Sequence, residues 1–479
     1  MSLSASALIL LSAATQAVDQ QAPPTVPMAP AYANLPAVTG ASAPSAEWWT
    51  AFDDPALDAL IESALAQNFD IAEAAARLDR ARAGIRAADG ARMPQLSFGA
   101  SAAVARLSEE DPQLGAARFL PGFDRNQDRY ALTAGASWEI DLFGRLGART
   151  RAARADALAS AHALDAARLA VASEIAQRYV SLRLLQQRRI VAEHRARALA
   201  EMTRLANLRV ERGIAPAIER DRLAAEARTA AAAIPQFLAA IEDQLARIDA
   251  VVGREIGTSR NALQDPAVIP VPRAIDLSLV PADLLRRRPD VLAAEATLAG
   301  RDARVAAALA DRLPRFNLGG LLGLIAGAIN PLFGAAAFAA QGEAAISYTA
   351  FDGGRSRANI DAARADVRGA AAAYQRSVLS AVAEVESTAA ARTSAEARIA
   401  SLGEAEQRLE STIRAVRRAQ EQGAASLSDV LDVDRRLQDA RDARLVAEAD
   451  RSFADIALIR ALGGGVSDGA DPMPAAPSR

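Results

Sequence analysis

The chain contains no cysteine, and it has no lysine either, so arginine supplies every basic charge apart from two histidines. Without cysteine it can form no disulfide, no thiolate nucleophile and no thiolate metal site. His162 and His194 lie on one predicted helix, about 48 Å apart along its axis, so they cannot share a metal ion within one chain. We therefore expect no catalytic residues, no metal and no cofactor, and the chain does not look like an enzyme.

Aromatic residues are also scarce, at 4%, and the net charge of -3 gives no reason to expect a nucleic-acid partner. No run of about 18 strongly apolar residues follows the first segment, so no transmembrane helix is expected. Any part of the chain inside a membrane must therefore be strand. Residues 1–17 resemble a secretory signal that lacks its positively charged start. We expect an extended N-terminal segment over 18–47 and a disordered C-terminal tail over 466–479.

The longest regular pattern is helical and runs from Arg145 to Glu211, with no proline and with Gly147 as its only glycine. A helix of that length would be about 100 Å long, whereas ordinary helices have about 11 or 12 residues. Its apolar residues recur at spacings of three and four, as in coiled coils, so it needs partners of similar length. A second helical run over 216–252 returns from it, and we expect a kink or break at Pro235.

Two segments before the long helix alternate with a period of two, which indicates strands. They cover 95–106 and 129–140 and are separated by a long polar loop. Each has roughly 10 to 12 residues, the length of a tilted strand that crosses a bilayer. Taken alone, the two segments fit an ordinary soluble hairpin as well.

The same order of predicted strands and helices then begins again after a linker over 254–280. Strands are expected at 316–325 and 342–351, with an apolar loop between them, and a long helix at 355–422 returns as a helix over 427–462. The interval from Phe143 to Gly213 matches that from Phe351 to Gly423 within two residues, and Gly213 to Gly253 equals Gly423 to Gly463. We interpret the chain as a tandem duplication. The first repeat covers 48–253 with a helical hairpin over 145–252. The second covers 281–465 with a hairpin over 355–462.

This duplication provides four strands, which are too few to close a barrel, since small barrels need about eight. Open strand edges are not tolerated inside a membrane, so copies of the chain must complete the sheet. Three copies would supply twelve strands. The predicted fold is therefore mainly α with a membrane β-barrel: a duplicated unit forms a trimeric 12-stranded β-barrel, continued by a 12-helix α-barrel. Such an assembly would be a conduit.

Several motifs resemble those of the TolC-like outer membrane factors, and more closely the OprM-like efflux branch. The resemblance covers nearly all of the chain from Trp48 to Gly465. The motifs are WWTAFDDPALDALIESALAQN (48–68), EIDLFGR (139–145), LLRRRPDVLAAEATL (284–298), FDGGRSR (351–357), SDVLDVDRRL (428–437) and ALGGG (461–465).

The resemblance implies an outer membrane channel with a long periplasmic extension, in a tripartite system that exports small molecules. Its implied partners are two further copies of the chain, a periplasmic adaptor protein, an inner-membrane RND-type transporter and outer membrane lipid. A channel for type I protein secretion has the same architecture and stays open as an alternative. A soluble helical scaffold with a small sheet is the alternative from another class.

The candidate site follows Gly423, at the turn between the last two helices; Gly213 is the equivalent turn in the first repeat. Asp429 and Asp432 are three residues apart and share a helix face, with Arg435 three residues further on. Two acidic residues at a helix start commonly just complement the helix dipole. The resemblance implies instead that Asp432 and Arg435 face the pore at a periplasmic gate, where three copies of the acids would form a ring.

Two features depart from the family pattern. Members of the OprM-like branch usually carry a lipid on an N-terminal cysteine, and this chain has none, so we expect no lipid anchor. Some relatives place an arginine directly after the turn glycine, whereas alanine follows Gly423 here. Among the remaining charged residues, we expect the arginines at 286–288 to support a helix start, and Glu384 and Glu386 to be surface charges.

Overall fold

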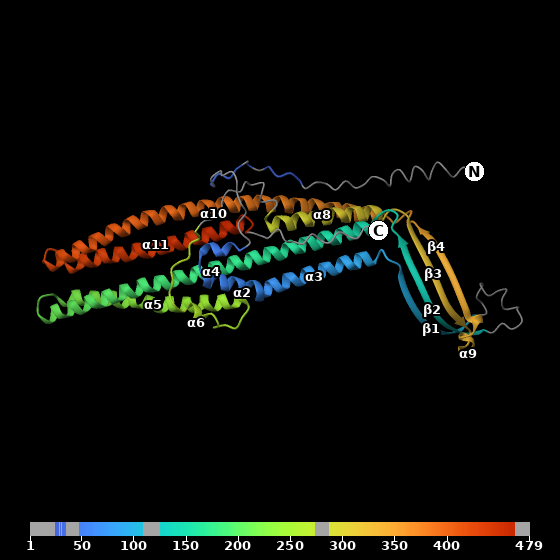
Figure 1. The fold of residues 1–479 in the computed structure, drawn as a ribbon, viewed down its shortest axis with the longest axis horizontal. Coiled ribbons are helices and arrows are strands. Elements are labelled where there is room, and N and C mark those ends of the chain that lie inside the picture. Colours follow the sequence, from blue (N-terminus) through green and yellow to red (C-terminus); the bar gives the residue numbers. More distant parts are fainter. Residues whose placement is uncertain are drawn as a thin grey trace. The chain divides into compact units, whose positions relative to one another are not determined.

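The computed structural model describes residues 24–27, 29, 31–34, 47–108, 125–273 and 287–464. The predicted signal-like segment, the C-terminal tail and most of the N-terminal segment lie outside the described residues. The described chain is mainly helical, as expected (Figure 1). It divides into two units. One unit contains residues 79–158 and 295–372, and the other contains 24–78, 159–294 and 373–464 among the described residues. Each unit draws on both predicted repeats, and the division into repeats stays a prediction.

The first unit is built on a four-stranded antiparallel sheet in the order β1-β2-β3-β4. The strands are β1 (Gln95–Arg106), β2 (Asn126–Ile140), β3 (Arg315–Ala326) and β4 (Phe338–Ser347), and Figure 1 shows them side by side. Directly paired residues share a face of the sheet, so the register gathers most of the large apolar side chains on one side. That face carries Leu96, Phe98, Leu132, Trp138, Leu318, Leu322, Leu324, Phe338 and Ile346, and the other carries mostly small and polar residues.

The last strand corrects the sequence-based prediction. We placed it at 342–351, but β4 covers Phe338–Ser347, because Phe338 pairs with Leu324 and extends the ladder into the predicted loop. Gly342 pairs with Gly320 inside the strand and does not begin it. What remains of the loop contains the short elements α9 (Ile329–Leu332) and η4 (Ala335–Ala337). A run of alanine and glycine carries too weak an alternation to locate a strand end from sequence alone.

The chain forms two long helical hairpins, which lie in the second unit except for residues 145–158 and 355–372, where their first helices begin in the first unit. The first joins α4 (Arg145–Glu211) to α5 (Ala217–Val252), and the second joins α10 (Arg355–Glu421) to α11 (Leu427–Ala461). The break expected at Pro235 is absent, and α5 is continuous through it. Proline removes one backbone hydrogen bond, and the other bonds of a 36-residue helix keep it helical. Among the described residues, no helix is both long and apolar enough to span a bilayer.

Five shorter helical elements accompany the hairpins in the described chain. They are η1 (Trp48–Phe52), α2 (Pro55–Gln67), α3 (Phe69–Gly90), α6 (Arg260–Leu263) and α8 (Pro289–Ala310). Asp54 caps α2 and also accepts a hydrogen bond from the Tyr179 hydroxyl, at 2.7 Å. Tyr179 lies in a core with Trp48, Ile61 and Ile175, and burial raises its pKa to about 12. The segment from Trp48 to Pro55 therefore packs in the core of the second unit.

A short segment near the start of the described chain is tied to α10. Tyr32 is buried among Tyr374, Val378 and Leu458. The Glu386 carboxylate accepts hydrogen bonds from the backbone N–H of Ala33 at 2.6 Å and of Asn34 at 3.1 Å, and from the Asn34 amide at 2.8 Å. The expectation that Glu386 is a plain surface charge is therefore wrong. Sequence cannot show this contact, because its partners are more than 350 residues apart.

Arg288 has a structural role, as we predicted for the arginines at 286–288; Arg286 lies outside the described residues. Arg288 is only 9% exposed, pairs with Asp290 and Glu384, and donates to the carbonyl of Ala461 at 2.9 Å. Arg460 binds the same glutamate at 2.7 Å. The surface role expected for Glu384 is also wrong. Burial would raise the pKa of Glu384, but the bonds from Arg460 and Arg288 outweigh that effect and lower it.

Candidate functional site

The two hairpins turn with nearly the same backbone geometry. Gly213 and Gly423 have φ angles of 69° and 77°, a left-handed conformation that favours glycine. In each turn the residue after glycine donates its N–H to a carbonyl five residues earlier, Ile214 to Arg209 and Ala424 to Ala419, both at 2.8 Å. The glycines predicted as helix-turn tips therefore end α4 and α10 in the same way.

The start of α11 is fixed by a capping box. The backbone N–H of Asp429 donates to the Ser426 hydroxyl at 3.2 Å, and the backbone N–H of Ser426 donates to the Asp429 carboxylate at 2.8 Å. The Ser426 hydroxyl also donates to this carboxylate, at 2.7 Å, and these bonds lower the pKa of Asp429. Asp429 thus lies where the sequence placed it, but its carboxylate is occupied in shaping the turn.

Asp432 sits one turn further along α11 and binds two arginines. Arg435 contacts it at 3.1 Å and Arg436 at 2.8 Å, so the structure brings the predicted pair together and adds a third residue. Sequence reasoning missed Arg436, although its i, i+4 spacing from Asp432 is an ordinary helix ion-pair signal. The Asp432 carboxylate is thus held between two guanidinium groups, and the three side chains together carry a net positive charge, whereas the sequence suggested an acidic cluster.

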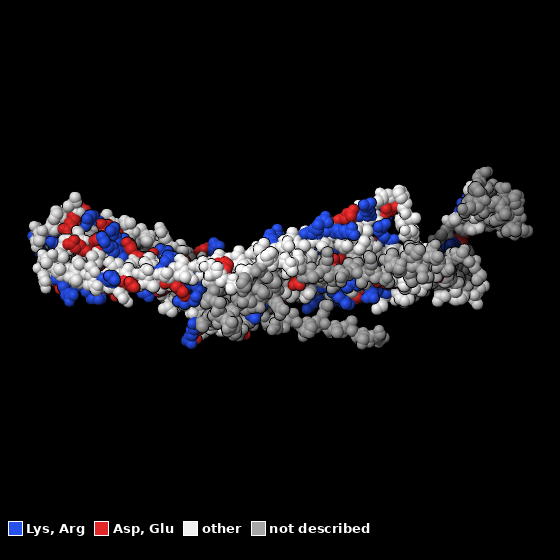
Figure 2. Space-filling view, turned by 90° about the horizontal axis from the view of Figure 1, so that it is seen from above, with Lys and Arg blue, Asp and Glu red and all other residues white. Residues whose placement is uncertain are grey.

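The start of α5 has no such cap. Pro216 occupies the N-cap position and provides no side-chain hydrogen bond. From this hairpin Arg222 reaches α11 and donates to the Ser428 hydroxyl at 3.2 Å. The two hairpins are therefore in contact at Ser428, which directly precedes Asp429. Figure 2 shows acidic and basic residues interspersed over the hairpin tips, drawn at the left.

A groove runs between α4, α5 and α11 beside these contacts, and we call it the tip groove. Its volume is about 1070 Å³, and its lining includes Ser428, Asp429, Asp432 and Arg435. Ion pairs join α4 to α11 along it, from Arg188 to Asp442 at 2.7 Å and from Arg195 to Asp439 at 3.2 Å. Among the described residues, no cluster of three or more histidine or acidic residues could hold a metal ion. The arrangement can shape and charge an opening, and it offers no reactive group.

Comparison with known proteins gives a consistent result. The family model described as outer membrane efflux protein matches residues 60–254 and 280–464. The pyoverdine export outer membrane protein OpmQ of Pseudomonas putida is 31% identical over 96% of this chain and 97% of its own length. Outer membrane protein OprJ of Pseudomonas aeruginosa is 28% identical over 96% of both chains.

Solved structures agree. The outer-membrane channel OprN superimposes with a TM-score of 0.82 at 30% identity, over 93% of this chain and 99% of that one. The Campylobacter jejuni CmeC outer membrane channel superimposes with a TM-score of 0.85 over 94% of this chain and 95% of that one. CmeC shares only 20% of its residues with this chain, so that likeness concerns the fold.

Proposed function

The chain belongs to the outer membrane efflux protein family, and from this premise we propose that three copies build one export conduit. It is an outer membrane channel of an efflux system, and a transport protein, not an enzyme. The resemblance to TolC-like outer membrane factors predicted from its motifs is confirmed. In our proposal, three copies form a 12-stranded β-barrel and a 12-helix α-barrel. A periplasmic adaptor and an inner-membrane RND-type transporter deliver small molecules to it, and outer membrane lipid surrounds the barrel.

The observation that carries this proposal is the open sheet. In the described chain β1 and β4 each pair on one side only, which leaves two strand edges with free N–H and C=O groups. Such edges are costly in a hydrocarbon environment, and pairing with neighbouring copies satisfies them. The sheet also has one apolar and one polar or small-residue face, as a lipid-facing wall around an aqueous lumen requires.

We place the gate at the hairpin tips, with Asp432 and Arg435 at the aperture and Asp429 holding the shape of the turn. The contacts support this division of roles. Asp429 is engaged by Ser426, whereas Asp432 is held by side chains of its own helix that can rearrange. The proposed aperture is lined by paired charges, so cations should be attracted to it less strongly than to a ring of bare acids.

Conductance in planar bilayers tests the gate. Asp432→Ala should raise the single-channel conductance and weaken block by divalent cations, because it removes the carboxylate and releases two arginines. Asp221→Ala is a matched control, because Asp221 is an exposed acid near the other tip, paired with Arg220. Conductance and block that stay unchanged in Asp432→Ala, or that change equally in the control, would remove Asp432 from the aperture.

The assembly has its own test. Heat-modifiable trimers in outer membrane fractions are expected, and a purified chain that stays monomeric and dissolves without detergent would overturn the trimer. The cargo separates the two channel hypotheses. OpmQ is named for pyoverdine export, and that similarity favours small molecules over secreted proteins. A deletion strain should therefore become sensitive to toxic compounds and should keep its secreted proteins.

A further inference from the structure

The connection between β3 and β4 is unusual because it contains no charged residue. None stands anywhere between Arg315 and Glu343, and the connection itself, residues 327–337, consists almost entirely of alanine, glycine and large apolar residues. We call it the apolar loop. Residues 107–125, which connect β1 to β2, include several acids and arginines instead. The apolar loop follows the strand ends opposite those that lead to α4 and α10.

The apolar loop folds back onto the sheet. Its short helix α9 lies against β2 and β3, and η4 lies against β3. Leu332 and Ala337 are only 7% and 6% exposed, so the loop is packed through these side chains. Its other two large apolar residues remain in contact with solvent, since Ile329 is 59% exposed and Phe333 is 73% exposed. The loop therefore has one packed side and one exposed apolar side, and such exposed patches commonly mark a contact surface.

The burial of the strands shows which face of the sheet the apolar loop covers. On the face with mostly small and polar residues, the four described strands carry two large apolar side chains, Leu321 and Ile325, and both are half-buried. Ala131 pairs with Ile325 on that face and is 7% exposed, although its β1 partner Ser101 is exposed. Within the described chain, the groove of about 610 Å³ on the opposite, apolar face is lined by strand residues alone. The loop therefore lies on the small and polar face.

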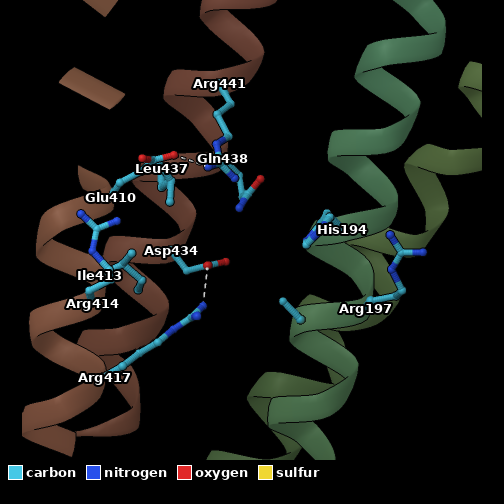
Figure 3. A pocket seen from close by; sticks show the side chains of 11 residues that line it. His194, Arg197, Glu410, Ile413, Arg414, Arg417, Asp434, Leu437, Gln438 and Arg441 are labelled. Carbon is cyan, nitrogen blue, oxygen red and sulfur yellow. Dashed lines mark hydrogen bonds and ion pairs between the residues drawn. The ribbon is translucent and has the colours of Figure 1, made fainter. Parts of the chain in front are cut away.

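The surfaces beside the hairpin tips have the opposite character. The groove between α4 and the α10–α11 hairpin is lined mainly by charged and polar side chains, among them His194 and Glu410 (Figure 3). An ion pair crosses its lining from Arg417 to Asp434, at 3.4 Å. A constriction near the tips would act on solutes through charge, whereas the apolar loop acts through the exclusion of water.

We propose that the apolar loop forms a constriction at the outer mouth of the channel and is a contact site for apolar cargo. This inference rests on the proposed function, in which the small and polar face of the sheet lines the lumen. Three copies of Ile329 and Phe333 then surround the water path. Apolar constrictions impede water and ions by dewetting, whereas an apolar molecule is stabilised when it leaves water for such side chains. The loop thus favours apolar solutes over charged ones of similar size.

Thiol labelling from outside the cell tests the proposal, because the chain has no cysteine of its own. Ser137→Cys places a thiol at an exposed position of the small and polar face, toward the strand ends away from the apolar loop. In intact cells, a negatively charged maleimide should react with this thiol severalfold more slowly than an uncharged maleimide of similar size, with each rate normalised to the unfolded chain. The added pair Ile329→Ser and Phe333→Ser should raise the rate of the charged reagent severalfold.

A matched control and the two reagents separate the possible failures. Phe98→Ser removes an aromatic side chain that is 86% exposed on the apolar face, and it should leave both rates unchanged. Heat-modifiable trimers show that each variant has assembled. Equal rates for the two reagents, or a charged reagent that is no faster in the serine variant, would overturn the constriction and leave the trimeric channel standing. A thiol at position 137 that neither reagent reaches in any variant would contradict the aqueous lumen, and with it both proposals.

Discussion

The two hairpins have nearly the same helix lengths and the same turn geometry, yet different interactions hold their helices together. Ion pairs join α10 to α11 along most of α11 and along residues 384–417 of α10. They link Arg392 to Asp455, Arg398 to Asp450, Arg417 to Asp434, Arg441 to Glu406 and Glu410, Arg444 to Glu406, Arg451 to Glu396 and Arg460 to Glu384.

The first hairpin shows nothing comparable. Between α4 and α5 the described residues form one long ion pair, from Arg209 to Glu219 at 3.9 Å, and Arg188 stacks on the Phe237 ring at 5.4 Å. Apolar packing therefore carries most of this hairpin. The comparison shows that one duplicated architecture tolerates two kinds of helix pairing. We therefore expect low pH, removal of a charged side chain and replacement of Pro235 to change the stability of the two hairpins differently.

Acidification should produce the largest difference in stability between the two hairpins. The pKa of Glu406 is lowered, because bonds from Arg441 and Arg444 outweigh the effect of burial, and that of Glu384 is lowered in the same way. A depressed folded-state pKa contributes stability above the unfolded value of about 4.3, and this is lost as the pH falls through the folded pKa. Below about pH 4.3, hydrogen exchange should accelerate in α10 and α11 more than in α4 and α5.

The acidic groups of the first hairpin give the contrast. Glu201 and Asp243 also have lowered pKa values, but each binds an arginine of its own helix, so protonating them does not separate α4 from α5. Asp455 is an exception in the second hairpin, because burial raises its pKa. Its contribution to stability is therefore retained at low pH and lost as the pH rises. Equal acceleration of exchange in both hairpins would contradict the comparison.

Arg392→Ala should be the most damaging single substitution in this set. It leaves the Asp455 carboxylate, which is 0% exposed, without its 2.7 Å partner. Removing one member of a buried pair costs about 3 kcal/mol or more, measured as the free energy of unfolding. Arg209→Ala in the first hairpin should cost less than about 0.5 kcal/mol. The double variant Arg392→Ala/Asp455→Ala should recover most of the loss, and a double variant as unstable as the single one would refute this cause.

Pro235→Ala should stabilise the first hairpin. The replacement restores a backbone N–H in the interior of α5 and should raise the free energy of unfolding by about 1 to 3 kcal/mol. Gln236→Ala, at the exposed neighbouring position, should change it by less than about 0.5 kcal/mol. Chemical denaturation of both variants provides the measurement. A destabilised Pro235→Ala variant would mean that the proline fits a bend in α5 that its packing requires.

The turn glycines should show no difference between the hairpins. An added Cβ meets nothing within 4 Å at Gly213 or Gly423, so only the positive φ opposes a larger residue. Gly213→Ala and Gly423→Ala should therefore each cost about 1 kcal/mol in thermal denaturation. Clearly unequal costs would show that one tip carries a contact that the other lacks.

Much of the fold was predictable because its signals are local. The period of two gave β1, the uninterrupted helical pattern gave α4, and glycine marked both tips. One prediction failed where the local signal was weak, at the alanine-rich start of β4, and of the kink or break expected at Pro235 only the break is excluded. The candidate site was half predictable: Asp432 and Arg435 follow from helix spacing. The pairings of Glu384 and Glu386 join segments distant in sequence, and spacing within a helix says nothing about them.

The hydrogen bonds that hold residues 33 and 34 against Glu386 have a consequence for the order in which the protein is synthesised. Ala33 and Asn34 leave the ribosome first, but the carboxylate that holds them belongs to Glu386, more than 350 residues later. The early segment lacks the partner for these hydrogen bonds until α10 has been synthesised as far as Glu386. A segment synthesised early is therefore held by a residue synthesised much later. A chain truncated before Glu386 should leave residues 32–34 accessible to proteases.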